Sequence, residues 1–449
     1  MKKNDYIPLE IHALTNEGNG VGRAGDGMAV FVPFTAVGDK ISCKIVKTAK
    51  AYAYGIVDKI EYPSPDRCDN DCEAFYRCGG CSFRHMSYGS ELVAKQDFVK
   101  NSFERIGKLS MEFEEILGCE NTERYRNKAQ LPVADENGRA ICGFFSKRSH
   151  RVMPISDCKL QPKEFFGIVD FVLKYQNEKG LSCYNENTHK GLLRHIYIRQ
   201  GEHTKETMLC LVTTKKTDSY NELAKSVCEK FENVVSVVLN VNPDKTNVVL
   251  GSRCITLCGK DTITDIMCGN KIEISPLSFY QVNTRQAERL YEIAAEYADL
   301  KDTDTLLDLY CGAGTIGLSM AKSVKRLIGV EIVAPAIENA KRNASLNGIE
   351  NAEFFCADAG KAANDLLRKG EKIDVIIADP ARKGCDKLSL DSMVALSPKR
   401  IVMVSCNHAT AARDCAYLEQ NGYKAVKCRA VDLFPRTTHV ECVTVLERK

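Results

Sequence analysis

TLLDLYCGAGTIGLSMA, residues 305–321, is the stretch that decides the fold of this chain. It opens with an apolar run short enough for a buried parallel strand. Glycines at positions 312, 314 and 317 then break the strand, and apolar residues at helical spacing follow. A strand, a glycine-rich turn and a helix in this order bring backbone N–H groups and a helix N-terminus against a ligand. No Gly-Lys-Ser/Thr follows, so the turn is not a P-loop; its G-x-G-x-x-G spacing fits a nucleotide-binding fingerprint.

Acidic residues end the strands predicted after this turn. These strands and acids are 326–331 with Glu331, 352–357 with Asp358, and 373–378 with Asp379. A helix is predicted over 335–347, between the second and third strands. Strands alternating with helices indicate a doubly wound α/β sheet, with its ligand at the carboxyl ends of the strands. A carboxylate after the second strand can accept the ribose hydroxyls of an adenosine.

A cysteine also ends a strand of the same predicted sheet. The segment RIVMVSCN, residues 400–407, carries Cys406 directly after its apolar run. Spacing alone leaves a nucleotide-dependent oxidoreductase open. A thiol at this edge would face the same crevice as the three carboxylates, and this argues against an oxidoreductase.

Length and composition indicate a multidomain enzyme of a reducing compartment. The chain has 449 residues, 44% of them hydrophobic and 27% charged, and a formal net charge of +3. Such near-neutrality requires any nucleic-acid surface to be local. No apolar run reaches the roughly 20 residues that span a bilayer, and the N-terminus lacks the apolar core of a signal peptide. We therefore expect a cytoplasmic protein, in which most of the 21 cysteines are buried thiols.

Short strands with regular turn signals run from residue 7 to residue 61. This pattern predicts a small β-barrel. The motifs GNGVGR (18–23), FVPF (31–34) and GD (38–39) resemble a TRAM domain, an OB-like barrel that binds RNA. Barrels of this type bind oligonucleotides on one face. Lysines interleave with Tyr52 and Tyr54, a pattern typical of RNA contacts, although a solvated strand face would look the same.

Four cysteines cluster behind a polar connector. They are Cys68, Cys72, Cys78 and Cys81, with Gly-Gly in the last loop. Clustering in polar sequence favours a metal or cluster site over inert thiols. Zinc prefers two separated C-x-x-C pairs, and clustered thiolates with a distant fourth partner suit a four-iron, four-sulfur cluster; the choice of iron–sulfur over zinc depends on the family resemblance described below. The pattern CxxxCxxC is missing, which disfavours radical use of S-adenosylmethionine.

The segment 124–163 is strongly basic and contains the candidate fourth cysteine, Cys158. It contains three acidic residues and nine basic ones, which are Arg124, Arg126, Lys128, Arg139, Lys147, Arg148, Arg151, Lys159 and Lys163. This local excess is the clearest footprint for phosphates in the chain, although a solvated surface without a partner would show the same composition. If Cys158 is a ligand, it ties the cysteine loop to the basic segment.

Nearly the whole chain resembles the RNA uracil-5-methyltransferase family. Within it, the chain is most similar to the bacterial 23S ribosomal RNA enzymes that carry a TRAM domain and an iron–sulfur cluster. The motifs that carry the resemblance are C-x5-CGGC (72–81), FYQVN (279–283), DLYCGAG (308–314), DPARKG (379–384), VSCN (404–407) and FPRTTHVE (434–441).

The resemblance implies an S-adenosyl-L-methionine-dependent RNA methyltransferase with a 4Fe-4S cluster. It implies cluster ligation by Cys72, Cys78, Cys81 and Cys158, with Cys68 as a bystander. It further implies that Cys406 and Glu441 are catalytic. The implied cofactor-binding residues are Gln281, Tyr310, Thr315, Glu331, Asp358 and Asp379. Thr315 stands where relatives can carry Asn, and His408 and Arg436 stand where relatives often have Pro and His.

Uracil chemistry explains why a thiol and a base are needed. Carbon 5 of uracil is a poor nucleophile until a thiolate adds to carbon 6. Carbon 5 can then take the methyl group, and a base must remove its proton so that the thiolate leaves. The target nucleotide must leave its stack, so we expect base flipping or a single-stranded loop.

The expected organisation has three domains and a monomeric state. These are a TRAM-like barrel (1–62), a central α+β domain with the cluster and the basic segment (63–270), and a methyltransferase domain (271–449). The expected substrate is 23S ribosomal RNA. Transfer RNA stays open as a substrate, although its enzymes usually lack both barrel and cluster.

Two competing functions depart further from this expectation. A cytosine-5 RNA methyltransferase would also use a cysteine, but should show it in a Pro-Cys or Thr-Cys-Ser setting. A non-enzymatic iron–sulfur RNA-binding protein would have no need for Cys406, Glu441 and the glycine-rich turn together. The sequence therefore favours uracil methylation over both.

Overall fold

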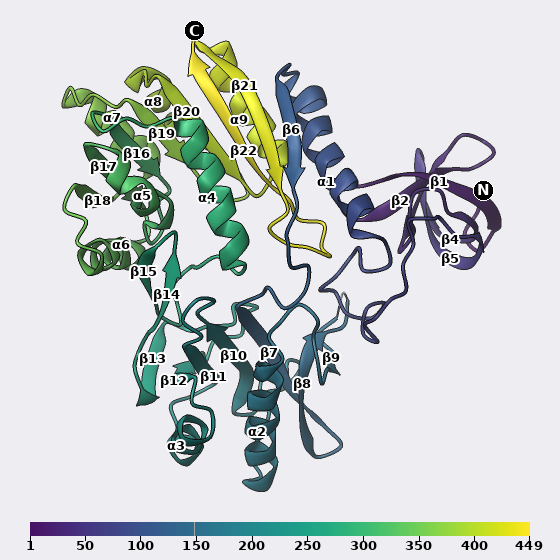
Figure 1. Ribbon diagram of the computed structural model, residues 1–449. Helices are drawn as coiled ribbons and strands as arrows, with labels where there is room; N and C mark the ends of the chain where they lie inside the picture. Colours follow the sequence, from purple (N-terminus) through teal and green to yellow (C-terminus); the bar gives the residue numbers. More distant parts are fainter. Residues whose placement is uncertain (148) are drawn as a thin grey trace.

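Three β-sheet units make up the computed structural model, which describes residues 1–147 and 149–449. Figure 1 shows a small N-terminal barrel to one side, a central sheet below, and a larger C-terminal sheet with its helices above. Arg148 of the predicted basic segment lies outside the described residues. Among the described helices, none is long and apolar enough to cross a membrane.

The N-terminal unit is a closed barrel with strand order β1-β2-β3-β5-β4. Its strands are β1 (Tyr6–Leu14), β2 (Asn19–Arg23), β3 (Ala29–Pro33), β4 (Lys40–Thr48) and β5 (Tyr52–Tyr62). Alternate residues are buried, so that Ile11, Val30 and Ile41 fill the interior. The predicted small barrel is confirmed, because the period-2 pattern gives each strand one face to bury.

The segments that follow the barrel in the chain belong to the C-terminal sheet, although they precede the strands of the central sheet in sequence. They are α1 (Tyr88–Ser102), a π-helical turn (Phe103–Gly107) and β6 (Glu112–Leu117). Strand β6 pairs in parallel with β21 (Tyr423–Val431), and α1 lies alongside it (Figure 1). Helix α1 begins at Tyr88 because the Ser87 side chain caps it by accepting a hydrogen bond from the Ser90 N–H. The domain division inferred from the sequence stays a prediction.

The central unit is a seven-stranded sheet in the order β13-β12-β11-β10-β7-β8-β9. Its strands are β7 (Lys128–Glu136), β8 (Arg139–Phe145), β9 (Val152–Pro154), β10 (Leu193–Gln200), β11 (Thr207–Thr213), β12 (Val234–Val241) and β13 (Arg253–Gly259). Helices α2 (Glu164–Glu178) and α3 (Asn221–Lys230) share its apolar core. A hairpin of β14 (Ile263–Met267) and β15 (Asn270–Ile274) leads to the C-terminal unit.

The C-terminal unit is an eight-stranded sheet in the order β18-β17-β16-β19-β20-β22-β21-β6. The further strands are β16 (Thr305–Leu309), β17 (Arg326–Glu331), β18 (Ala352–Cys356), β19 (Val375–Ala378), β20 (Arg400–Ser405) and β22 (Glu441–Arg448). The helices are α4 (Thr284–Ala298), α5 (Thr315–Met320), α6 (Ala334–Leu346), α7 (Ala359–Arg368), α8 (Lys387–Leu396) and α9 (His408–Gln420), with a 3₁₀ turn at Ala321–Ser323.

Both faces of this sheet are covered by helices, which confirms the doubly wound α/β core. Leu306 of β16 packs in the cluster that includes α4, α5 and α6. Its neighbour Leu307 packs in the opposite cluster, with α7, α8 and α9. Strand order reverses between β16 and β19, which creates the crevice where such sheets bind ligands. Strand β22 runs antiparallel to β20, and β21 and β6 continue the sheet beyond it.

Candidate active site

The glycine-rich turn after β16 forms the floor of the crevice. Gly312 and Gly314 have φ angles of 55° and 80°, a backbone region that residues other than glycine rarely adopt. Gly317 donates its N–H to Asp308 Oδ2 at 2.9 Å, and a Cβ there would lie 2.7 Å from that oxygen. At Gly312 a Cβ would meet nothing within 4 Å, so the turn is packed from below and open above.

Two carboxylates stand beside this turn. Glu331 Oε2 accepts the Gly312 N–H at 3.3 Å, and its Oε1 accepts the Val333 N–H at 2.9 Å. Asp358 caps α7 by accepting the Lys361 N–H at 3.2 Å. Both side chains are partly exposed at the carboxyl ends of neighbouring strands, as their sequence positions predict.

Cys406 and Glu441 lie opposite each other across two antiparallel strands. The last registered pair of β20 and β22 is Ser405 with Cys442, so the next position along sets Cys406 against Glu441. Asp379 ends the adjacent parallel strand β19. One thiol and two carboxylates thus lie at the ends of three neighbouring strands, next to the point where the strand order reverses.

Burial raises the pKa of all three groups above the values that they have in water. It raises the pKa of Glu441 to about 8, with the charge of Asp379 as a smaller cause. It raises the pKa of Asp379 to about 7. The pKa of Cys406 rises to about 11, because the thiol is buried and because Glu441 and Asp379 oppose a thiolate. The site therefore has an excess of acidic groups that favours a bound cation.

The hydroxyl of Tyr291 on α4 links two of the candidate cofactor residues. It lies 3.1 Å from Thr315 Oγ1, and Gln281 also lies within reach of it. The backbone of Gln281 is fixed in turn, because its carbonyl accepts the Asn127 side-chain N–H at 2.8 Å. Sequence analysis missed Tyr291, whose place in a helical apolar stripe gives no sign that its hydroxyl reaches the crevice.

Tyr310 points its hydroxyl away from the glycine turn. This hydroxyl donates to Ser389 Oγ of α8 at 3.1 Å, while the residue itself has a φ of 66°. Any contact of Tyr310 with a bound cofactor would therefore come from its ring or its backbone.

The segment before Glu441 is held by α1 and by the cysteine loop. Lys95 Nζ lies 2.7 Å from both Glu91 Oε1 and Asp432 Oδ1, and all three side chains are fully buried. The carbonyl of Arg436 accepts the Ser82 N–H at 2.8 Å. Elements far away in sequence thus fix the loop that leads to the candidate base.

The four predicted cluster ligands line one pocket. Cys72, Cys78, Cys81 and Cys158 all face it, and Cys68 does not. The Gly80 N–H donates to Cys78 Sγ at 3.3 Å. Burial raises the pKa of Cys81 to about 11.

The surroundings of this pocket fit an anionic cluster. Arg84 is buried, and its Nε and Nη2 atoms have no partner among the described residues, although Cys81 lies close by. No group of three His, Cys, Asp or Glu side chains in the described ranges converges as a single metal ion requires. A 4Fe-4S cluster binds one thiolate at each of four irons, so its ligands surround a volume instead of one point.

Part of the basic segment serves the structure. Arg124 is engaged bidentately by Asp157, at 2.6 and 2.7 Å, and also donates to the carbonyl oxygens of Cys158 and Gln161. Asp157, one of the three acidic residues of the segment, therefore offsets the charge of Arg124, which serves to hold the segment together.

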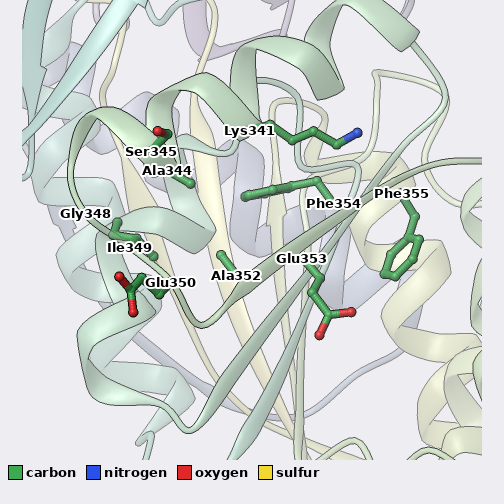
Figure 2. Close-up of a pocket in the computed structure, with 10 residues that line it drawn as sticks. All are labelled: Lys341, Ala344, Ser345, Gly348, Ile349, Glu350, Ala352, Glu353, Phe354 and Phe355. Carbon is green, nitrogen blue, oxygen red and sulfur yellow. The ribbon is translucent and has the colours of Figure 1, made fainter.

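A separate open hollow is lined by α6 and the edge strand β18. Figure 2 shows Lys341, Ala344 and Ser345 of the helix near Phe354 of the strand, while the Phe355 ring points away from the helix. Neither Cys406 nor Glu441 lines it, so it is not the catalytic crevice.

Comparison with known proteins identifies the family. The family described as tRNA (Uracil-5-)-methyltransferase matches residues 87–449, and a TRAM domain matches residues 2–57. The chain belongs to the RNA uracil-5-methyltransferase family. It is 41% identical over 447 residues to an RNA methyltransferase of Clostridium tetani, covering 99% of this chain and 97% of the relative. It is 43% identical over 447 residues to one of Listeria monocytogenes, covering 99% and 98%.

A solved structure is similar over nearly the whole length. It is the Pyrococcus abyssi tRNA (uracil-54, C5)-methyltransferase in complex with S-adenosyl-L-homocysteine, with a TM-score of 0.78 and 26% identity. The match covers 98% of this chain and 100% of that one. This uracil-5-methyltransferase therefore methylates carbon 5 of uracil in RNA and uses S-adenosyl-L-methionine.

The crevice fits that methyl donor. Asp308 Oδ1 is buried without a partner among the described residues, and Gly312 faces open space. The carboxylates of Glu331, Asp379 and Glu441 complement a positively charged sulfonium.

Proposed function

We propose that Cys406 is the nucleophile and Glu441 the base of this uracil-5-methyltransferase. The observation that carries the proposal is their cross-strand opposition, one step beyond the pair Ser405–Cys442. A cytosine-5 enzyme would be expected to have a different cysteine setting from Ser405-Cys406-Asn407.

The residues act in a fixed order. The Cys406 sulfur bonds to carbon 6 of uracil, and its proton passes to a neighbouring carboxylate. Carbon 5, now nucleophilic, takes the methyl group that S-adenosyl-L-methionine supplies as an electrophile. Glu441 then removes the proton from carbon 5, the double bond re-forms, and the carbon–sulfur bond breaks.

Cofactor binding falls to the groups around the glycine turn. Glu331 at the end of β17 takes the ribose hydroxyls, and Asp358 lies beside it for the adenine. The remaining residues of this set are Gln281, Tyr310, Thr315 and Asp379. Their support is their position in the chain: Tyr310 and Thr315 flank the glycine turn, and Asp379 follows β19, the parallel neighbour of β16. The Tyr291 hydroxyl lies 3.1 Å from Thr315 Oγ1.

The proposed substrate is a uridine in 23S ribosomal RNA. Its support is the combination of a TRAM barrel with a pocket of four cysteines. The barrel carries an outer aromatic group of Phe31, Tyr52 and Tyr54, with ring centroids 5.6–5.8 Å apart, on which bases can stack.

Transfer RNA is the second candidate. The supporting observation is the full-length similarity to the P. abyssi enzyme, which is named for uracil 54 of tRNA. Purified enzyme should be given unmodified 23S and transfer RNA in separate reactions with labelled S-adenosyl-L-methionine, and the methylated uridine mapped by mass spectrometry. Label in transfer RNA alone would refute the ribosomal assignment. Label in neither RNA with Cys406→Ala would support the nucleophile.

The four-cysteine pocket is proposed to hold a 4Fe-4S cluster through Cys72, Cys78, Cys81 and Cys158. Bound there, the cluster would fix the cysteine loop, which in turn holds the Arg436 carbonyl through the Ser82 N–H. Iron and sulfide content of anaerobically purified protein tests this assignment. We further propose a monomer organised as 1–62, 63–270 and 271–449, which sedimentation and limited proteolysis would test.

A further inference from the structure

Two cationic side chains lie on neighbouring strands of the central sheet, and no carboxylate of the described residues pairs with either of them. Lys128 of β7 is the direct cross-strand partner of Arg199 of β10. Like charges in this position destabilise a sheet. Lys128 has no ion-pair or hydrogen-bond partner among the described residues, and Arg199 Nη2 is buried and equally unpartnered. An anion supplied by a binding partner would offset the repulsion between the two cations.

Burial destabilises the protonated form of Lys128 in the free protein. Burial lowers the pKa of Lys128 to about 8, with the nearby guanidinium groups of Arg199 and Arg126 as smaller causes. Arg126, in contrast, borders the cysteine pocket, where thiolates can offset its charge. This leaves the Lys128–Arg199 pair as the uncompensated one.

The pair is connected by hydrogen bonds to the segment that carries Phe279 and Gln281. Arg199 Nη1 donates to the carbonyl oxygens of Ser275 at 2.9 Å and Ser278 at 2.7 Å. The next residue, Phe279, is 73% exposed. On the other side of Lys128, Asn127 holds the backbone of the 281–282 segment, because its side chain donates to the Gln281 carbonyl and its N–H to the next one. An anion at Lys128 would therefore sit next to an exposed aromatic ring and the candidate cofactor residue Gln281.

We propose that Lys128, next to the buried Arg199, binds one backbone phosphodiester of the RNA beside the flipped uridine. Lys128 is partly exposed and makes the contact, whereas Arg199 is 2% exposed and adds positive potential from the neighbouring strand. A phosphate fits because phosphate contacts fix the register of a nucleic acid without reading its sequence. The site follows from RNA methylation as such and does not depend on whether the RNA is ribosomal or transfer RNA.

Salt dependence of RNA binding tests the contact directly. Lys128→Gln should weaken binding of a substrate RNA hairpin roughly 10- to 100-fold, the range of a charge-assisted hydrogen bond. It should also lower the slope of log K against log salt by about 0.7–0.9. Lys128→Arg should restore the slope. The matched control is Lys225→Gln, an exposed lysine on α3 at the far end of the central sheet (Figure 1), which should leave the slope unchanged.

Neutral methylphosphonate linkages locate the phosphate. At one linkage next to the target uridine, the wild-type enzyme should lose affinity by the same factor as Lys128→Gln does with native RNA, and the variant should lose no more. An unchanged salt slope, or additive losses at every linkage, would overturn the proposal. So would weaker binding of S-adenosylhomocysteine to Lys128→Gln, because it would assign the lysine to the cofactor carboxylate.

Discussion

Replacing Glu441 by Gln should stabilise the enzyme at alkaline pH while it stops turnover. The pKa of Glu441 rises from its ordinary value of 4.5 to about 8, chiefly because the side chain is buried. Between these two values the folded protein holds a proton that the unfolded chain has lost. Stability contributed by this group therefore falls as pH rises through that window, at most by roughly 1.4 kcal/mol per pH unit.

The magnitude follows from the same difference. A pKa moved from 4.5 to about 8 corresponds to about 5 kcal/mol at full ionisation. This is an upper bound, because part of the pKa shift comes from the charge of Asp379. That part is absent whenever Asp379 is protonated. Glutamine keeps the volume and cannot ionise. The free energy of unfolding of Glu441→Gln should therefore rise progressively above that of the wild type from about pH 5 to about pH 8.

Urea unfolding at several pH values measures the stability difference, and turnover gives the second readout. Loss of the base should lower kcat by about 10²–10⁴ and leave methylated RNA bonded to Cys406, visible as a complex that survives denaturation. The control is Glu447→Gln on the same strand, where the carboxylate is exposed and paired with Arg400 at 2.9 Å. Stability curves of wild type and Glu441→Gln that run parallel with pH would refute the buried, protonated Glu441. Normal turnover would refute its role as the base.

Four further substitutions test separate parts of the structure. Cys406→Ala should abolish methylation and the bonded complex while S-adenosylhomocysteine still binds in calorimetry; residual methylation would exclude the thiol as nucleophile. Cys158→Ser should lower iron content and visible absorbance of the purified protein, and unchanged iron would remove Cys158 from the ligand set. Lys95→Met should cost about 3–5 kcal/mol in urea unfolding, because two buried carboxylates lose their partner; a loss below about 1 kcal/mol would contradict that burial. Gly317→Ala should cost about 1–3 kcal/mol and weaken S-adenosylhomocysteine binding, since the new methyl meets Asp308 and Leu327; unaltered binding would show that the turn adapts.

The sequence predicts those parts of the fold that local patterns control. The apolar run 305–309 became β16, and the acidic ends of β17 and β19 lie at the crevice edge as expected from parallel strands. The helix predicted over 335–347 is α6, Ala334–Leu346, so its two ends differ from the prediction by one residue each. Periodicity reaches only as far as one element, and so these successes are local ones.

Long-range pairing lies beyond such patterns. Nothing in the spacing of Cys406 and Glu441 shows that β22 runs antiparallel beside β20, and their facing positions depend on that register. The same holds for β6, which crosses from a distant part of the chain to pair with β21. The direction of a side chain is equally hidden from the sequence. The hydroxyl of Tyr291 contacts Thr315, whereas the hydroxyl of Tyr310 contacts Ser389, and nothing in the sequence distinguishes the two tyrosines.

The charges of the crevice suit the order of the reaction. Glu441 and Asp379 are hard to ionise together, because burial raises the pKa of both and the charge of Asp379 raises that of Glu441 further. While a sulfonium is present, these carboxylates have a counter-charge and can ionise beside Cys406. Once the methyl group has moved, that positive charge is gone and Glu441 becomes more basic. This is the moment at which the proton on carbon 5 has to be removed, so Glu441 gains basicity in the step that requires it.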